Sequence, residues 1–257
     1  QGNASSGLGI AKTSVSSGIA DVLLGFRELP EVILNTCIDG MHLAPATREL
    51  IGLEVESFGV SSTTGDPITY SGPSGVSAIL NALSEEYGWQ AITENNQPIA
   101  LIRDHHRVTL EPGGQIELSS APAVDMFELA NDFARFREEL VAVSHPLGVT
   151  HLGLGTHPFA TVDDIGWVPK SRYDRMKRYL PARGHLAHHM MKATASIQVS
   201  LDFSDEEDMR RKFRVGMALA PLAVALFAAS PLSGGQPNGY HSLRGHIWRY
   251  TDPDRCG

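Results

Sequence analysis

The sequence predicts an α+β fold in which a largely antiparallel sheet has helices packed behind it. Three patterns carry this prediction. Residues 51–58 and 196–203 alternate apolar and polar side chains, which is typical of strands with one buried face. Residues 79–87 carry apolar side chains at helical spacing before Gly88, a common helix stop. A Pro-Gly-Gly sequence at 112–114 predicts a type II turn between two further strands.

The remaining elements are taken in chain order. Residues 1–49 are expected to form a helical lead-in. Short runs at 99–102 and 107–111 predict strands, and the alternation resumes at 115–119 after the turn. The polar face of the predicted sheet therefore carries carboxylates.

Two longer helices are expected in the second half of the chain. The charged amphipathic stretch 123–144 predicts a helix that His145-Pro146 ends. The segment 150–155 is interpreted as a buried strand that enters a loop. The sequence from Ser204 to Glu207 matches a capping box and opens a further helix, which Pro221 must kink.

Composition excludes several classes of protein. The 257 residues include 21 Lys and Arg against 29 Asp and Glu, which gives a formal net charge of −8. This balance argues against a general nucleic-acid or anionic-membrane binder. Cys37 and Cys256 form no CxxC pair, so neither a disulfide scaffold nor a thiolate zinc site is expected. No apolar segment reaches the roughly 18–20 residues of a membrane span and no signal peptide is visible, so we expect a cytoplasmic location.

Four carboxylates are candidates for a metal site. Glu54 and Glu56 leave the same face of one strand about 7 Å apart, a spacing that an exposed sheet face also tolerates. Glu111 and Glu117 flank the Pro-Gly-Gly turn, and Gln198 offers an amide oxygen on another polar strand face. Oxygen ligands converging on one face would suit Mg²⁺, a hard cation that prefers carboxylates.

Basic and imidazole side chains leave alternatives open. Arg244 and Arg255 lie in the C-terminal segment, where a guanidinium could hold a phosphate or carboxylate in a bidentate manner or form a surface salt bridge. The basic segment 170–178 is interpreted as a solvated helix face. Three histidines at helical spacing could bind Zn²⁺ from one helix or simply form its polar face: His185, His188 and His189.

A series of motifs resembles the glutamate–cysteine ligases of the plant and proteobacterial type. The resemblance covers nearly everything from about residue 50 onward, and its most specific element is Glu-Pro-Gly-Gly-Gln-Ile-Glu-Leu-Ser at 111–119. The other motifs are Ile51 to Phe58, Tyr70 to Gly75, Leu152 to Gly155, Trp167 to Tyr173, Ala195 to Phe203, Pro237 to Gly239, His246 to Trp248 and Thr251 to Arg255.

The resemblance implies a glutamine-synthetase-like fold whose sheet lines an active-site funnel containing ATP and Mg²⁺. The implied reaction, in glutathione-type thiol synthesis, joins the γ-carboxylate of glutamate to the amine of cysteine through a γ-glutamyl phosphate. Site residues implied in this way are four metal ligands, two catalytic residues and two cofactor-binding residues. They are, in that order, Glu54, Glu56, Glu111 and Glu117; Arg244 and Lys192; Arg255 and Gln198.

Domain organisation follows from the same resemblance. We expect one partial catalytic domain over residues 1–257, with the ligase core at 50–257 and a C-terminal truncation, because the chain stops abruptly and family chains are considerably longer there. The expected partners are small molecules: glutamate, cysteine and ATP.

Departures from the family pattern concern the amine acceptor most. Lys192 stands where the family usually has Arg, and Ser200, His189 and Ala229 replace a usual Asn, Asp and Asn. Three alternatives therefore remain: a related carboxylate–amine ligase with another amine, a catalytically incomplete nucleotide- or metal-binding fragment, and a metal-dependent hydrolase built on the histidines.

Overall fold

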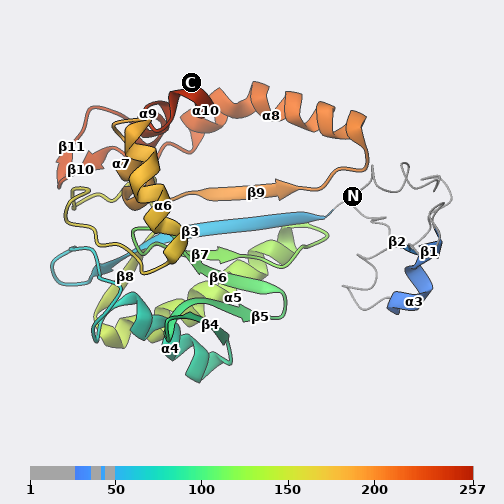
Figure 1. Cartoon of the computed structure of the whole chain (residues 1–257), viewed down its shortest axis with the longest axis horizontal. Helices are drawn as coiled ribbons and strands as arrows, with labels where there is room; N and C mark the ends of the chain where they lie inside the picture. The colour runs from blue at the N-terminus through green and yellow to red at the C-terminus, as the bar shows by residue number, and fades with distance from the viewer. Residues whose placement is uncertain (1–26, 36–41, 44–49, 257) are drawn as a thin grey trace. The chain divides into compact units, whose positions relative to one another are not determined.

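The computed structural model describes residues 27–35, 42–43 and 50–256 (Figure 1). These residues belong to two compact units. The first unit draws on 1–52, 122–128 and 199–221, and the second draws on 53–121, 129–198 and 222–257. The single catalytic domain with a core at 50–257 stays a prediction.

A seven-stranded sheet organises the described chain. Its strands are β3 (Ile51–Ser61), β4 (Gln90–Glu94), β5 (Gln97–Arg103), β6 (His106–Leu110), β7 (Ile116–Ser119), β8 (Val149–Leu152) and β9 (Ile197–Leu201). The strand order is β4-β5-β6-β7-β3-β8, with β9 pairing β3 off this path. All registered pairings from β4 to β8 are antiparallel, which confirms the predicted α+β fold with a largely antiparallel sheet.

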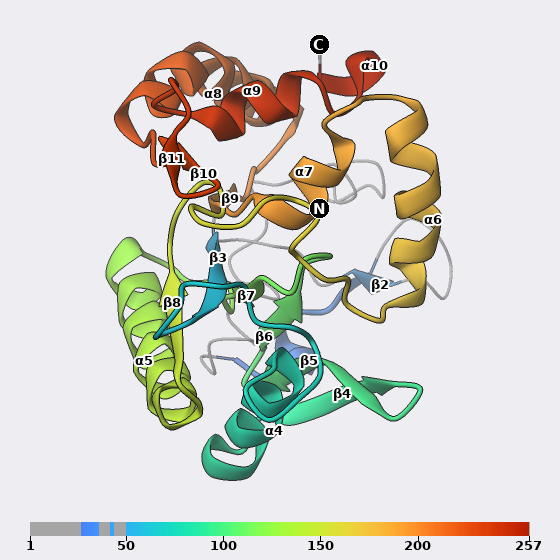
Figure 2. The ribbon, with the colours of Figure 1, turned by 90° about the vertical axis from the view of Figure 1, so that its left-hand side faces the viewer.

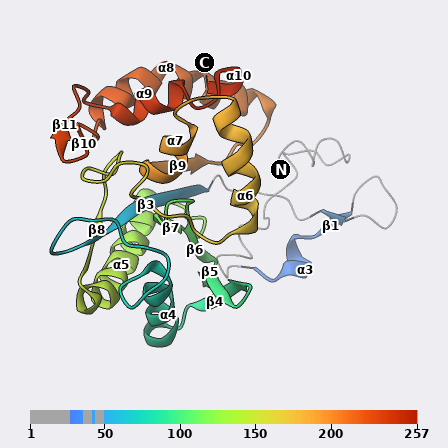
Figure 3. The ribbon, with the colours of Figure 1, turned by 60° about the vertical axis from the view of Figure 1, so that its left-hand side comes forward.

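The helices lie between these strands and after them. They are α4 (Val76–Tyr87), α5 (Met126–Ser144), α6 (Ser171–Tyr179), α7 (Ala187–Ala193), α8 (Glu206–Leu226), α9 (Leu243–Arg249) and α10 (Pro253–Cys256), with 3-10 turns η2 (His145–Leu147) and η3 (Leu180–Ala182). A two-residue pair, β10 (Leu232–Ser233) with β11 (Gln236–Pro237), precedes α9. In the second unit, α4 and α5 lie beside the sheet (Figure 2), and α6 and α7 lie beyond β3 and β7 on the other side (Figure 3).

Only parts of the N-terminal segment are described. They hold one helical turn, α3 (Leu29–Val32), and an antiparallel pair of two-residue strands, β1 (Leu34–Asn35) and β2 (His42–Leu43). The rest of the predicted helical lead-in over 1–49 lies outside the described residues, as does Cys37.

Helix ends explain where the boundary predictions hold. The predicted stop at Gly88 is confirmed, because its φ of 72° is left-handed and its N–H donates to the carbonyl of Ser84. Helix α5 starts three residues later than predicted, since the Asp125 carboxylate accepts the N–H groups of Phe127 and Glu128. Helix α8 starts two residues after Ser204 and continues through Pro221.

Strand β4 was not predicted. Its residues Gln90–Glu94 lie at the edge of the sheet and are mostly exposed, so the apolar alternation that marks the inner strands is missing there. The chain reverses into β5 at Asn95 and Asn96, whose φ angles of 51° and 60° are left-handed. Asn is one of the few residues that adopt this conformation at low cost.

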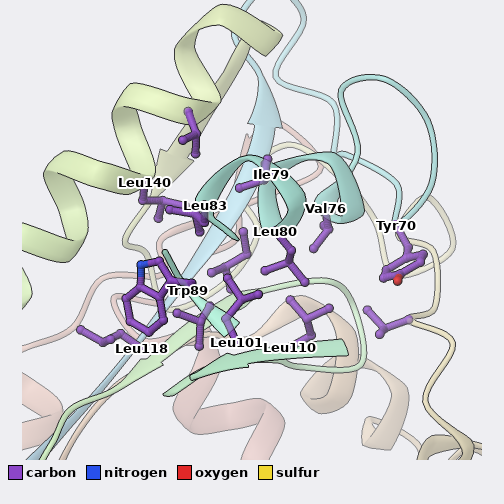
Figure 4. Close-up of a cluster of buried hydrophobic side chains, with 14 of the residues drawn as sticks. Tyr70, Val76, Ile79, Leu80, Leu83, Trp89, Leu101, Leu110, Leu118 and Leu140 are labelled. Atoms are coloured by element: carbon purple, nitrogen blue, oxygen red, sulfur yellow. The ribbon is translucent and has the colours of Figure 1, made fainter. Parts of the chain in front are cut away.

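The main core occupies one face of the sheet (Figure 4). Helix α4 contributes Ile79, Leu80 and Leu83, which are fully buried against strand residues that include Leu110 and Leu118. Successive strand side chains point to opposite faces. Burying Leu110 and Leu118 on the core face therefore directs the neighbouring side chains of β6 and β7 to the opposite face, where the candidate site is built.

Helix α8 leaves several large apolar side chains exposed. In the first unit, Phe213 and Met217 of this helix are 65% and 62% exposed. Among the described residues, no helix combines the length and the apolar character that crossing a bilayer requires.

Burial of His157 predicts a loss of stability in mild acid. Its ring is 3% exposed and its Nδ1 accepts the N–H of Ala160 at 3.0 Å, so burial lowers the pKa to about 4. The unfolded ring titrates near pH 6.5, so the unfolded state binds more protons between pH 6.5 and 4, and stability falls as the pH falls through that window. We expect His157→Gln to remove about 1–2 kcal/mol of this loss, allowing for screening by water.

Chemical denaturation of both proteins at pH 7.5 and pH 4.5 measures the effect. The exposed His145 supplies the control, since His145→Gln should keep the pH profile of the native chain. Parallel profiles for the native chain and His157→Gln would contradict the assignment.

Candidate functional site

Three acidic side chains share the face of the sheet opposite the core. The register of β3, β7 and β6 sets Glu56 directly across from Glu117, and Glu117 directly across from Thr109. Residues directly opposite each other in an antiparallel pair point to the same face with Cβ atoms about 4.5–5.5 Å apart. Glu54 lies two residues before Glu56 on β3, so its side chain points to the same face, opposite Ser119.

Glu111 extends this row at the turn after β6. It follows Thr109 by two residues, and its charge acts on Glu56, while the charge of Glu117 acts on Glu111 itself. The structure therefore brings together the four predicted carboxylates, which we call the acidic row: Glu54, Glu56, Glu111 and Glu117.

Strand β9 and the residue before it supply hydrogen bonds to the middle of the acidic row. The backbone N–H of Ser196 donates to Glu56 Oε2 at 2.9 Å, and the side-chain amide of Gln198 donates to Glu56 Oε1 at 3.3 Å. Gln198 was predicted to offer its carbonyl oxygen to a ligand. It does reach the site, but it meets Glu56 through its nitrogen.

Two polar contacts of the row were missed by the sequence analysis. The Ser196 amide is one, because a backbone donor leaves no signal in the sequence. Thr109 is the other: its hydroxyl donates a hydrogen bond to Glu117 Oε2. Its position two residues before Glu111 in an alternating strand was the available signal.

The pKa shifts within the acidic row indicate that its negative charges are not fully compensated by nearby cations. Burial, with the charges of Glu111 and Glu117, raises the pKa of Glu56 to about 7, although the Ser196 N–H and Arg244 oppose the rise. Burial and the charge of Glu117 also raise the pKa of Glu54 and of Glu111. A cation between such carboxylates would stabilise their charged forms.

Cationic side chains border the row. Arg244 acts on Glu56, and its buried Nε–H has no hydrogen-bond partner among the described residues. Near Glu111, Lys170 donates from Nζ to the carbonyl of Leu110 at 2.9 Å, and Arg172 also lowers the pKa of Glu111. Both residues were expected on a solvated helix face. Arg172 is exposed on α6, as expected, whereas Lys170 is half-buried and precedes the helix; its place in the Trp167–Tyr173 motif was the available signal.

The two remaining candidates make contacts elsewhere. The ammonium of Lys192 donates to the carbonyl of Val162 at 2.5 Å and lies 5.2 Å from the centre of the Trp167 ring. Arg255 forms an ion pair with Asp252 at 2.9 Å. The structure thus brings Arg244 to the acidic row but gives Lys192 and Arg255 other partners, and their catalytic and cofactor-binding roles stay predictions.

Donor chemistry determines which metal the site suits. Among the described residues, no three His, Cys, Asp or Glu side chains surround one point closely enough to hold a metal ion as they stand. This holds for the acidic row as well as for the three histidines; His188 contacts the carbonyl of Lys177, and His185 packs on Tyr250. The acidic row fits Mg²⁺ by its chemistry, because it is an all-oxygen donor set in which burial and, after it, mutual repulsion raise the pKa of Glu56 and of Glu111.

Comparisons with known proteins agree on one family. The family model of glutamate–cysteine ligase family 2 matches residues 50–257. A chloroplastic glutamate–cysteine ligase A from Oryza sativa subsp. japonica is 44% identical over 213 residues, which are 83% of this chain and 43% of the relative. The chloroplastic glutamate–cysteine ligase of Arabidopsis thaliana is 42% identical over 80% of this chain and 39% of the relative.

One solved structure shows a more distant similarity to this chain. A glutamate–cysteine ligase from Francisella tularensis, in complex with AMP, covers 67% of this chain and 30% of its own with 17% identity and a TM-score of 0.39.

The relatives also bear on length and location. The chain spans about two fifths of the length of the curated relatives that it matches, at 43% and 39% for the two above. The cytoplasmic location expected from the sequence is wrong on this comparison, because the plant relatives are chloroplastic.

Repulsion within the acidic row predicts a stabilising substitution. In buffer with a metal chelator at pH 8, Glu56→Gln should raise the free energy of unfolding by about 1–2 kcal/mol, since it removes a charge that burial, Glu111 and Glu117 all disfavour. The amide oxygen of the substituted side chain can still accept the Ser196 N–H. Urea denaturation measures the change.

A surface carboxylate provides the matched control. Glu86 is exposed on α4, and Glu86→Gln should change stability by less than about 0.5 kcal/mol. Loss of stability in Glu56→Gln would show that the row is not strained by its own charge.

Proposed function

The chain belongs to glutamate–cysteine ligase family 2, and from this we propose that it takes part in the ATP-dependent joining of the glutamate γ-carboxylate to the amine of cysteine, the first step of glutathione synthesis. Since the chain spans less than half of its relatives, the complete reaction is proposed for the whole protein. The relatives' names favour a plastid as its location.

The proposed chemistry has two steps. An oxygen of the glutamate γ-carboxylate attacks the γ-phosphorus of ATP, which releases ADP and forms a γ-glutamyl phosphate. The amine of cysteine then attacks the acyl carbon, phosphate leaves with the bonding electron pair, and the amine loses a proton as the amide forms. Because anionic groups must meet in the first step, positioning and charge neutralisation dominate the catalysis.

The acidic row is the observation that carries this proposal. Its four carboxylates would hold Mg²⁺, which supplies charge neutralisation for the triphosphate and the attacking carboxylate. Ser196 and Gln198 fix Glu56 in the row through their hydrogen bonds. Arg244, with its unpartnered Nε–H among the described residues, would orient a substrate carboxylate or phosphate from the edge of the row.

Two predicted residues make other contacts in this structure. Lys192 donates to the carbonyl of Val162 and Arg255 pairs with Asp252, and their catalytic and cofactor-binding roles stay predictions. Lys170 and Arg172, which act on Glu111, are the better candidates for contact with phosphate groups.

Two alternatives remain distinct in experiment. A related ligase would use another amine with the same acidic row, and competing amines in one assay would separate it from a cysteine ligase. A catalytically incomplete fragment would bind nucleotide and metal but release no ADP even within a full-length protein.

Release of ADP from ATP with glutamate, cysteine and Mg²⁺ tests the proposal. In the full-length protein, Glu56→Gln should lower kcat by at least about 100-fold because the carboxylates act only through the charge they carry. Chelation with EDTA should abolish the activity, and added Mg²⁺ should restore it.

Glu86→Gln again serves as the control and should retain activity within about twofold. ADP release that depends on neither Mg²⁺ nor Glu56 would rule out the acidic row as the reaction centre. ADP release with another amine but not with cysteine would identify the alternative ligase.

A further inference from the structure

The turn that carries Glu111 is hydrogen-bonded to residues 191–194, the segment that leads into β9. Gln115 in this turn is 2% exposed, and its side-chain amide donates to the carbonyl of Thr194 at 2.7 Å and to that of Met191 at 3.5 Å. Its backbone carbonyl accepts the N–H of Glu111 at 3.0 Å. One residue thus contacts both Glu111 and the end of α7.

Gly113 brings the same two segments into direct contact. A Cβ atom placed on Gly113 would lie closer to the backbone carbonyl oxygen of Lys192 than real Cβ atoms lie to any neighbour. Any other residue would therefore push the turn and the end of α7 apart. Because the nearest contact is between two backbone segments, no flexible side chain could move aside to make room for the added Cβ atom.

The other side of the turn is held as well. The carbonyl of Pro112 accepts the N–H of Val168 at 2.9 Å, and the carbonyl of Leu110 accepts from Lys170 and from the Tyr173 hydroxyl. With this side fixed, a change at Gly113 or Gln115 moves the contact with residues 191–194 first.

Residues 191–194 lead directly to the groups that hold Glu56. Ser196 and Gln198 follow within four residues of Thr194 and donate to the two oxygens of the Glu56 carboxylate. The contact of Gln115 and Gly113 therefore connects the two sides of the acidic row: Glu111 on the turn, and Glu56 through Ser196 and Gln198.

We propose that Gln115 and Gly113 are positioning residues that set the separation of Glu111 from Glu56, and through it the affinity of the acidic row for a divalent cation. This inference rests on the proposed function. Neither side chain would touch the cation or the substrates; both act through the two carboxylates.

The chemistry of Gln115 supports a positioning role over simple packing. Its Oε1 is buried and has no hydrogen-bond partner among the described residues, which costs free energy. A methionine of similar length would fill the space without that cost. The amide therefore contributes the direction of its two hydrogen bonds.

Binding of Mn²⁺, followed by electron paramagnetic resonance, tests the inference without any need for turnover. In the full chain, Gly113→Ala should weaken the binding of Mn²⁺ by about 5–10-fold, because even a small shift separates carboxylates that must meet one ion. Gly166→Ala is the matched control: its added Cβ meets nothing within 4 Å, and the affinity should stay within about twofold.

A second pair of variants keeps the test decisive if Gly113→Ala fails to fold. Gln115→Met removes both donated hydrogen bonds at nearly constant volume and should weaken Mn²⁺ binding by about fivefold. Ser84→Ala removes one hydrogen bond, from the Ser84 hydroxyl to the carbonyl of Trp89, far along the chain from the acidic row, and should leave the affinity unchanged. Melting temperatures of both variants separate lost stability from lost positioning.

The outcomes are distinct. Weaker binding in Gln115→Met, and in Gly113→Ala where that variant folds, with unchanged binding in both controls, supports the inference. Tight binding by the native chain that survives in Gln115→Met overturns the inference and leaves the proposed function standing. A native chain that binds no Mn²⁺ overturns both, because the acidic row then holds no cation.

Discussion

Repulsion between carboxylates that share one face of the sheet is the constraint on which the site depends. Glu56 and Glu117 are cross-strand neighbours, and they cannot move apart without breaking the pairing of β3 with β7. Leu118 of β7, which pairs with Val55 of β3, is buried on the opposite face and holds β7 in that register. The free energy of the hydrophobic core thus holds like charges together, and burial raises the pKa of Glu56 rather than letting water screen it.

The sequence predicts the residues of this site better than it predicts their geometry. Alternation places Glu54 and Glu56 on one strand face, and the Pro-Gly-Gly turn places Glu111 near Glu117. Register is different, because it depends on long-range pairing: Ser196 and Glu56 are 140 residues apart in the chain. No local pattern sets that contact, so the donors to Glu56 became visible only in the structure.

The same reasoning explains the cationic residues. The sequence does not distinguish these cationic residues by role, because charge alone does not show what the end of a long side chain contacts. They are Lys192, Arg255, Lys170 and Arg172. The carbonyl of Val162 and the carboxylate of Asp252 engage the first two, whereas Lys170 is fixed beside Glu111 by Leu110. In the fold, edge strand β4 was missed for a related reason: its exposure removes the apolar pattern by which inner strands are predicted.

Charge along the site changes sign in a way that suits two anionic reactants. Arg244 lies at the Glu56 side of the acidic row, and Lys170 with Arg172 lies at the Glu111 side. Cations at both ends can each attract an anionic group, and the carboxylates between them repel that group unless a divalent ion intervenes. Under the proposed function, a site of this pattern would disfavour an anion alone and favour it together with its metal ion, which is the form in which a triphosphate is carried in solution. The repulsion between the carboxylates would then contribute selectivity for the metal-bound substrate.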